Sequence, residues 1–426
     1  MRKLLLLLLL TALLLCACAG QSAAGSAVPE GVDILLTGEG ARIACGGVKA
    51  EGGAVTVSAV GRYVVSGSLR DGQIVVDTGE DAVDVTLVLS GADITCADGP
   101  AIWVRQAKNV YLELAQGTEN RLCSGTEADL AAFDDSRSGA ALYSEDDLIL
   151  RGGGSLAVLG HLNNGITCKD DLRIEGGTLR VTAANNGIRA SETLELAGGE
   201  VSVSAGNDGL KTSSSEKEGK GWILISGGSL AVECGGDGIS AVTDLRAEGG
   251  SVRVNTLGLP GGGSCKGLKA GGSLSVTDGS IAVTAPDDGL HADGDLRIEG
   301  GTLRVTAVTG LQAGIKDSGE GSVLLSGGSV SIFAEKQAVK FEENFSADCR
   351  LLALYGSGKQ GTPHAGGQAY LLAELSGRAG ELVRIGDREE SAERDFSALL
   401  YTDEELTAGE SYEILVGERS IRAVAR

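Results

Sequence analysis

An acidic or amide residue stands directly before a glycine at a regular interval along the middle of this sequence. We call this place the Asx position, and the residues that occupy it in successive copies are Asn164, Asn186, Asp208, Asp237, Lys266 and Asp288. A second amide or acid often precedes it, as at Asn163, Asn185, Asn207 and Asp287. Calcium takes about six to eight oxygen ligands and mixes carboxylates with carbonyls and water. Stacked copies would bring these oxygens together, so Asn186, Asp208, Asp237, Asp287 and Asp288 are candidate calcium ligands.

The Asx position also has a purely structural interpretation. Asn and Asp before Gly are common in turns, because their side chains hydrogen-bond to their own backbone and tolerate a left-handed conformation. Stacked Asn side chains would also share amide hydrogen bonds. Asn164 and Asn186 replace Asp in the first copies, and Lys266 replaces it in the fifth, which weakens a continuous line of calcium ligands. Calcium binding and turn stabilisation therefore both stay open.

Basic residues recur three positions after the Asx position. The residues there are Thr167, Arg189, Lys211, Ser240, Lys269, His291, Lys316 and Lys340. The aliphatic residue before each is expected to be buried, so these side chains should point outward beside the Asx residues. They either neutralise the neighbouring acids, which adds little stability at an exposed site, or bind a polyanion such as a chain of carboxylates. Arg189, Lys211, Lys269, His291 and Lys316 are therefore candidate ligand-binding residues.

A repeated phrase must position these residues. It reads GGTLRVTAANNGIRA at 176–190, GGEVSVSAGNDGLKT at 198–212 and DGSIAVTAPDDGLHA at 278–292. The second residue of the opening doublet falls at Gly154, Gly177, Gly199, Gly228, Gly250, Gly279, Gly301 and Gly328, so the unit is about 22 residues long. A fixed period of this size is typical of a solenoid, in which each repeat buries its apolar face against its neighbours.

Each unit offers three inward segments. Strands with alternating apolar residues follow the doublet, as at Leu179 and Val181, and precede the next one, as at Leu194 and Leu196. A third aliphatic position follows the Asx turn and is Ile166, Ile188, Leu210, Ile239, Leu268, Leu290, Ile315 and Val339. Three inward segments joined by Gly-rich corners predict an all-β fold, a right-handed parallel β-helix whose coils lie about 4.8 Å apart.

The period also predicts the organisation of the chain. We expect the β-helix to span 61–355, with regular coils from about 144. Residues 30–60 should cap its amino end. Residues 356–426 lose the period and should form a cap or small β element at the other end, because an open β-helix edge would template aggregation.

The first residues carry an export signal. Two basic residues and an apolar run to Leu15 are typical of a signal peptide, and the run is too short to span a membrane. It ends in LCAC, which resembles the bacterial lipoprotein cleavage box and predicts removal of 1–17 and lipidation of Cys18. Residues 18–29 would then be a flexible tether. We expect an exported lipoprotein on the outer face of the cytoplasmic membrane or the cell surface, with the lipid as its membrane contact.

The net charge and the cysteine content argue against some partners and some kinds of site. The formal net charge is −22, from 36 Lys and Arg against 58 Asp and Glu, which argues against binding of nucleic acid. The cysteines after Cys18 form no CxxC pair and are odd in number, so neither a zinc cluster nor a disulfide framework is indicated. Most should be small core residues, and we expect a monomer.

The repeat GGxLxVxAxxDGI(K/R)A, the lipoprotein leader and the tail LLYTDEELTAGESY at 399–412 together resemble a family of secreted bacterial carbohydrate-binding domain-containing proteins. The resemblance covers roughly residues 50–420. It implies a right-handed parallel β-helix related to pectate-lyase-like solenoids, calcium sites on that helix, and binding of plant or cell-wall polysaccharide, including acidic polymers. The residues that match the family's Asx position are Asn186, Asp208, Asp237 and Asp288, and those that match its basic position are Arg189, Lys211, Lys269 and His291.

Three functions fit these features. Non-catalytic binding of a polysaccharide is favoured, because the basic residues recur as a pattern. A calcium-dependent polysaccharide lyase is the first alternative: calcium would acidify the proton beside a uronate carboxylate, and Lys211 or Lys269 would remove it. A surface adhesin or scaffold without a specific glycan is the second.

Other motifs add little to this choice. Neither GxSxG nor HExxH occurs. Aromatic residues are few, and Trp222 and Trp103 are the main candidate sugar platforms, so a charged or flexible glycan is expected rather than crystalline cellulose. Insertions at 212–221 and 257–264 bracket the coil of Asp237, which predicts a groove between them.

Overall fold

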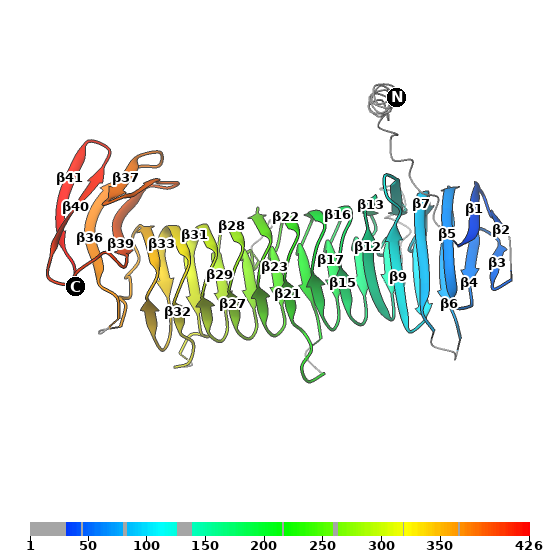
Figure 1. Ribbon diagram of the computed structural model, residues 1–426, viewed down its shortest axis with the longest axis horizontal. Helices are drawn as coiled ribbons and strands as arrows, with labels where there is room; N and C mark the ends of the chain where they lie inside the picture. The colour runs from blue at the N-terminus through cyan, green and yellow to red at the C-terminus, as the bar shows by residue number, and fades with distance from the viewer. Residues whose placement is uncertain are drawn as a thin grey trace, which may run out of the picture.

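The computed structural model describes residues 31–43, 46–79, 83–125, 139–214, 217–258, 263–317, 319–364 and 367–426, which form a long β-solenoid (Figure 1). Strands and no helices occur in these ranges, so no described segment is an apolar helix able to cross a bilayer. The predicted signal peptide, the lipidation site Cys18 and the tether lie outside the described residues. The all-β parallel β-helix expected from the period is confirmed.

The coils stack into three parallel ladders of strands, which we call stacks 1, 2 and 3. Stack 1 follows the glycine doublet and contains β10 (Glu119–Ser124), β13 (Ser155–Gly160), β16 (Thr178–Ala183), β19 (Glu200–Ala205), β22 (Ser229–Cys234), β25 (Ser251–Thr256), β28 (Ser280–Thr284), the first parts of β31 (Thr302–Ala313) and β33 (Ser329–Lys340), and β35 (Arg350–Tyr355). Each strand pairs in parallel with its equivalent one coil later.

Stack 2 follows the Asx turn and is built of short strands. It contains β4 (Ala54–Val57), β6 (Gln73–Asp77), β8 (Ile102–Gln106), β11 (Leu142–Ser144), β14 (Ile166–Cys168), β17 (Ile188–Ala190), β20 (Leu210–Thr212), β23 (Ile239–Ala241), β26 (Leu268–Ala270), β29 (Asp288–Ala292) and the last parts of β31 and β33. Arg189, Lys211 and Lys269, which were predicted to point outward, occupy the middle position of β17, β20 and β26.

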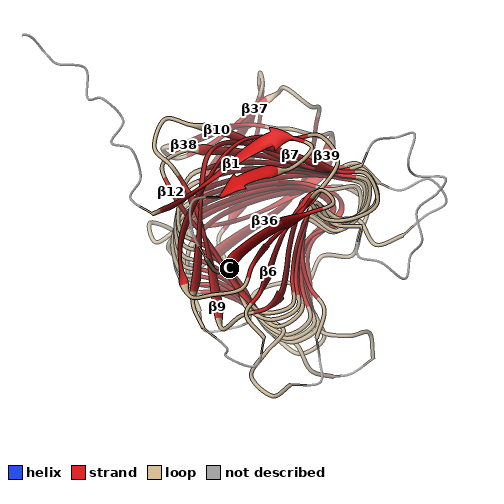
Figure 2. Cartoon of the chain, turned by 90° about the vertical axis from the view of Figure 1, so that its right-hand side faces the viewer, coloured by secondary structure: helices blue, strands red, loops and turns tan. Residues whose placement is uncertain are grey.

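Stack 3 leads back to the next doublet. It contains β1 (Val32–Gly38), β5 (Gly61–Leu69), β7 (Val85–Cys96), β9 (Asn109–Leu114), β12 (Asp147–Gly152), β15 (Leu172–Ile174), β18 (Leu194–Leu196), β21 (Ile223–Ile225), β24 (Leu245–Ala247), β27 (Leu274–Val276), β30 (Leu296–Ile298), β32 (Val323–Leu325) and β34 (Phe345–Ala347). The strands β5 and β7 also continue around the corner into stack 1. Viewed along the axis, the strands superpose around one core (Figure 2).

The core is a set of aliphatic ladders, as the alternating pattern predicts. Leu179 and Val181 of β16 lie in register with Val201 and Val203 of β19, and all four are at most 2% exposed. Burial of each such side chain contributes about 1.5–3 kcal/mol. Because every coil repeats these positions, the core runs unbroken along the solenoid and holds the outer residues at fixed spacing.

The second glycine of the doublet is required by the corner. Gly199 has φ +85°, and a Cβ there would lie 2.7 Å from the carbonyl oxygen of Gly177 in the previous coil. A side chain at this place would be strained in its backbone and would also collide with its neighbour. The doublet therefore fixes where stack 1 begins in each coil.

One predicted position is wrong. Ile315 was expected inside, but it is 58% exposed, and Leu311 takes the buried place between Leu290 and Val339. In this coil β31 runs continuously from stack 1 into stack 2, with a register shift after Ala307 in place of an Asx turn. The sequence offers two similar phrases, GLQ at 310–312 and GIK at 314–316, and the earlier one continues the strand.

Both ends of the solenoid are covered by antiparallel strands. Within the segment expected to cap the amino end, β2 (Ala41–Ile43) pairs with β1 and β3 (Val48–Glu51) pairs with β4, while β1 and β4 themselves stack in parallel on the following coil. At the other end β39 (Phe396–Thr402) pairs with β35, and β36 (Tyr370–Gly377) pairs with β39. Such strands remove the open edge that parallel stacking leaves.

A separate four-stranded antiparallel sheet completes the carboxyl end. It contains β38 (Arg388–Ser391), β37 (Leu382–Ile385), β40 (Ser411–Val416) and β41 (Arg419–Val424), in that order. We call β36–β41 the carboxyl-terminal element. It projects beyond the outline of the solenoid at its carboxyl end (Figure 1).

The described cysteines are core residues, as expected. They are Cys96, Cys123, Cys168, Cys234, Cys265 and Cys349, and each is buried with a free thiol. Burial raises the pKa of Cys96, Cys234 and Cys349 to about 12. The thiol form therefore dominates at neutral pH, which makes these residues poor nucleophiles and poor metal ligands.

Candidate functional site

The Asx residues form a column of hydrogen bonds from coil to coil. The backbone N–H of Asp237 donates to Oδ1 of Asp208 at 2.9 Å, and the N–H of Lys266 donates to Oδ1 of Asp237 at 2.9 Å. Asn186 and Asn164 accept in the same way from the following coil. All four Asx side chains are buried. One oxygen of each is therefore committed to the turn of its neighbour.

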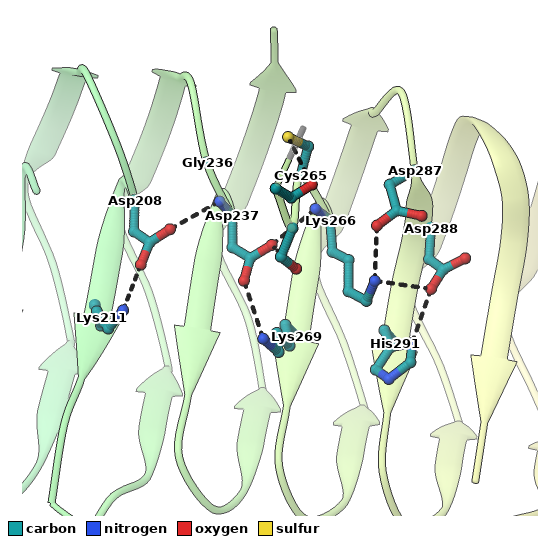
Figure 3. A network of polar contacts seen from close by, with 12 residues as sticks. Asp208, Lys211, Gly236, Asp237, Cys265, Lys266, Lys269, Asp287, Asp288 and His291 are labelled. Carbon is teal, nitrogen blue, oxygen red and sulfur yellow. Dashed lines mark hydrogen bonds and ion pairs between the residues drawn. The ribbon is translucent and has the colours of Figure 1, made fainter. Parts of the chain in front are cut away.

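Oδ2 of each Asp in this column is paired with a nearby basic side chain (Figure 3). Lys211 Nζ lies 2.7 Å from Asp208 Oδ2, and Lys269 Nζ lies 3.3 Å from Asp237 Oδ2. His291 Nδ1 lies 2.8 Å from Asp288 Oδ2. The basic residues thus lie beside the Asx residues as predicted, and their charges are balanced locally.

Lys266, which takes the Asx position in its coil, forms ion pairs with two acids of the next coil. Its Nζ lies 2.7 Å from Asp287 and 3.2 Å from Asp288. Burial alone would lower the pKa of Lys266, but the hydrogen bond to Asp287 and the charge of Asp288 outweigh it and raise that pKa. Burial would likewise raise the pKa of Asp288, yet His291 and Lys266 lower it. The sequence signal for this bridge was a lysine facing two consecutive acids of the next coil.

The predicted calcium ligands do not fit a calcium ion in this arrangement. In both Asp208 and Asp237, one carboxylate oxygen accepts a hydrogen bond from a backbone amide and the other pairs with an ammonium group. Among the described residues no three acids, histidines or cysteines gather as a metal-ligand set. The column therefore stabilises turns and pairs charges, and calcium binding at Asn186, Asp208, Asp237, Asp287 and Asp288 stays a prediction.

The remaining predicted ligand-binding residues are scattered. Arg189 lies on the stack 2 face and hydrogen-bonds Ser213 Oγ at 3.1 Å. Lys316 lies in the exposed turn after β31, and Gln312 takes its predicted place between His291 and Lys340. Lys316 therefore does not belong to the basic column, for the same reason that Ile315 is not in the core.

Trp222 and the two insertions lie at two corners of the solenoid. The first insertion precedes β21 at the corner between stacks 2 and 3, where Trp222 Nε1 donates to the carbonyl oxygen of Gly219 at 3.1 Å. The second insertion lies between β25 and β26, at the corner between stacks 1 and 2. The two insertions leave the solenoid at different corners, on either side of stack 2, and the groove between them stays a prediction.

A groove does lie on the outer face of stack 1, across β19, β22, β25, β28 and β31. Its volume is about 730 Å³. The side chains that line it are Ser202, Ser204, Ala231, Glu233, Arg253, Asn255, Ala282, Thr284, Arg304, Thr306 and Glu393. These are the outward positions of the strands, two in each coil, and they are hydroxyl, amide, charged or small.

One end of this groove is formed by a residue far away in the sequence. Glu393, in the loop between β38 and β39, hydrogen-bonds Arg304 Nε at 2.6 Å and also accepts from Thr306. Burial would raise the pKa of Glu393, but the bonds from Thr306 and Arg304 lower it. Nothing in the repeat points to Glu393, because it follows the last coil.

Some charged side chains in the groove form ion pairs, and others do not. Arg304 is neutralised by Glu390 and Glu393. Arg253 and Glu233 are exposed, and neither makes an ion pair with another described residue. The sequence signal for Arg253 was partial, because its column in stack 1 also holds Arg180 and Arg304 but small residues occupy the coils between them. The groove therefore offers unpaired polar groups, which the Asx column does not.

Comparison with known proteins identifies the family. The profile of the carbohydrate-binding domain-containing protein family matches residues 51–310 and 267–373, well over half of the chain. The chain belongs to this family. The match includes the Asx column and the five strands of the groove, and it ends before β37 and Glu393.

Two individual proteins are similar to this family member. A carbohydrate-binding domain-containing protein of Acetivibrio thermocellus is 39% identical over 132 residues, which cover 30% of this chain and 45% of that protein. The chain therefore spans less than half of that relative. A solved structure of the polysaccharide lyase-like protein from C. thermocellum, a gadolinium derivative, has 26% identity and a TM-score of 0.48, and the match covers 63% of this chain and 97% of that one.

Proposed function

We propose that this family member binds a polysaccharide chain, without cleaving it, in the groove on the outer face of stack 1. The observation that carries the proposal is the lining of the groove, where polar side chains are exposed on the four successive strands β19, β22, β25 and β28. Sugars present hydroxyl groups at regular intervals, and a row of donors and acceptors on rigid strands is suited to them. Membership of a carbohydrate-binding family supports the same assignment.

The groove runs along the solenoid axis. Five strands spaced by about 4.8 Å give it a length of about 19 Å, whereas the two outward positions of one strand are only about 7 Å apart. A polymer therefore fits best when it crosses the strands and meets a new pair of side chains in each coil. This repeated contact favours an extended chain over a single sugar.

Binding without cleavage is supported by the state of the two candidate bases. A β-elimination needs an uncharged lysine or arginine beside the proton that it removes. Lys211 and Lys269 are each paired with a buried carboxylate, which engages the nitrogen that would have to remove the proton. Both also lie in stack 2, away from the strands that line the groove.

Arg253 favours a polymer that carries carboxylates. Its side chain is exposed in the middle of the groove, on β25, and forms no ion pair among the described residues. A guanidinium binds a carboxylate through two parallel hydrogen bonds, which are stronger than neutral ones. We therefore favour an acidic polysaccharide, such as a polyuronate, over a neutral one. The same proposal includes display of the protein at the cell surface through lipidated Cys18.

A retention experiment tests the proposal. Residues 30–426 are incubated with insoluble and immobilised polysaccharides, including polygalacturonate, xylan and cellulose, and bound protein is measured. We expect retention on polygalacturonate that weakens with added salt, because salt screens exposed charges. Absorbance of unsaturated products should stay flat, and its rise would favour the lyase alternative. Lack of retention on every polymer would overturn the proposal in favour of an adhesin or scaffold.

A further inference from the structure

The outer face of stack 1 changes character along the solenoid. Its outward side chains are exposed in β19 and β22, whereas in β31 Arg304 is half-buried and Thr306 is buried. In β33 and β35 the outward residues Phe333, Leu352 and Leu354 are apolar and at most 1% exposed, and beside them Ser331 is also buried. The polar face therefore gives way to an apolar face within a few coils.

The carboxyl-terminal element covers that apolar face. Phe333, Leu352 and Leu354 belong to one buried cluster with residues of β36, β37, β39 and β40, among them Leu371, Val383, Leu399 and Ile414. The cluster is separate from the core of the solenoid. Because its apolar contacts are extensive and buried, the element is fixed in place on stack 1.

Polar contacts fix the rim of this element at the end of the groove. Arg388 Nη2 donates to Ser331 Oγ at 2.8 Å, and Arg394 Nη1 donates to the carbonyl oxygen of Ala307 at 2.7 Å. Between them Arg304 bonds both Glu390 and Glu393 and lies over the ring of Phe333 at 4.6 Å. These contacts form a wall across the outer face of stack 1.

The opposite end of the groove has no such wall among the described residues. Beyond β19 the next strand of the ladder is β16, and its outward residues Arg180 and Thr182 are exposed. The polar surface therefore continues toward the amino end and stops at the carboxyl end. A polymer that lies along the axis can extend in one direction only.

We propose that the groove receives the end of a polysaccharide chain, with the terminal sugar against Glu393, Arg304 and Thr306. This inference rests on the proposed function and adds which part of the polymer is bound. The wall comes from a part of the chain outside the family match, which ends at residue 373. End recognition is thus a property that the carboxyl-terminal element gives to this protein.

Chain length separates end binding from binding along the polymer. The number of chain ends per gram falls tenfold when the mean chain length rises tenfold, whereas the number of internal sites per gram stays nearly constant. Size-fractionated polygalacturonate and size-fractionated xylan are immobilised at equal mass, and the saturating amount of bound protein is measured. We expect capacity to fall about tenfold between fractions that differ tenfold in length. A capacity independent of length would overturn the inference and leave the proposed function intact.

A variant of the wall gives an independent readout. Glu393→Ala should weaken binding of short oligosaccharides from the same polymer about tenfold, while Glu413→Ala, an exposed acid on β40, should leave it unchanged. Thermal unfolding of both variants checks that they fold. Unchanged affinity in folded Glu393→Ala would overturn the contact with the terminal sugar. Lack of retention of every fraction by the wild-type protein would overturn the proposed function and this inference together.

Discussion

The Asx column and the stack 1 groove use similar residues for opposite purposes. In the column Asp208 and Asp237 each accept a backbone amide and face a lysine, and the Asx side chains are buried. In the groove Arg253 and Glu233 are exposed and make no ion pair with other described residues. Paired charges hold coils together, whereas exposed unpaired groups are available to a ligand. The regular pattern therefore marks structure, and the irregular one marks the proposed site.

This difference has a physical origin. A buried carboxylate without partners is costly, so a column of acids persists only where each oxygen is satisfied. A solvated face has no such requirement, and its side chains can vary from coil to coil. Repetition is thus expected wherever stacking imposes the same constraint, and the looser repetition on the outer face of stack 1 leaves room for specificity.

The largest effect on stability is expected when Asp237 in the Asx column is replaced. Asp237→Ala leaves the buried N–H of Lys266 and the hydroxyl of Ser264 without their acceptor. One unsatisfied buried donor costs about 1–3 kcal/mol, so we expect a loss of about 2–3 kcal/mol of unfolding free energy. Urea unfolding measures it. Asp237→Asn keeps an oxygen for the amide and should lose less.

The same variant distinguishes the two regions. Folded Asp237→Ala should keep wild-type retention on polygalacturonate, because Asp237 does not line the groove. If the folded variant is no longer retained on polygalacturonate, the glycan site lies at the Asx column and not in the stack 1 groove.

The second prediction concerns the loss of stability at low pH, to which we expect Asp288 to contribute. The pKa of Asp288 is lowered below its ordinary value of 3.8 in the folded protein, because His291 and Lys266 outweigh the effect of burial. A lowered folded pKa adds stability above the ordinary value, and this contribution is lost as the pH falls through the folded pKa. Unfolding free energy should therefore decrease from about pH 4 downward, and less so in Asp288→Asn. Equal slopes in both proteins would show that Asp288 is not the titrating group.

The fold could be predicted from the sequence because the constraints of stacking repeat. The Leu179, Val181 and Ile188 positions are apolar in nearly every coil, and Gly199 is required by a corner that recurs. The predicted family and the parallel β-helix are accordingly confirmed. The error at Ile315 and Lys316 arose where one coil lost its Asx turn and two similar phrases competed for one position.

The proposed site could not be predicted in the same way. The column of Arg253 holds arginine again at Arg180 and Arg304 but small residues in the coils between them, and Glu393 comes from the carboxyl-terminal element, 89 residues after its partner Arg304. The repeat therefore carries an interrupted signal for Arg253 and none for Glu393. The contact depends on how that element lies on Phe333, Leu352 and Leu354, which is a property of tertiary packing.

A third prediction tests the groove at Arg253. Arg253→Ala should weaken binding of polygalacturonate about tenfold, which corresponds to about 1.4 kcal/mol. Its unfolding free energy should stay within about 0.5 kcal/mol of wild type, because the side chain is exposed and unpaired. The matched control is Arg246→Ala, in the same coil but on the outer face of stack 3. Equal loss in both variants would indicate a general effect of charge and would remove Arg253 from the site.

The smallest effect is expected from removal of calcium. EGTA should leave retention and unfolding free energy unchanged, because the Asx oxygens are already bonded to amides and ammonium groups. The competing prediction, that calcium assists binding, requires retention to fall with EGTA and to return with added calcium. Asp208→Asn sharpens the choice, since it would weaken calcium binding while an amide oxygen remains as acceptor for the N–H of Asp237. A chelator effect that disappears in this variant would make the column a metal site, and pairing with Lys211 would then describe only its calcium-free form.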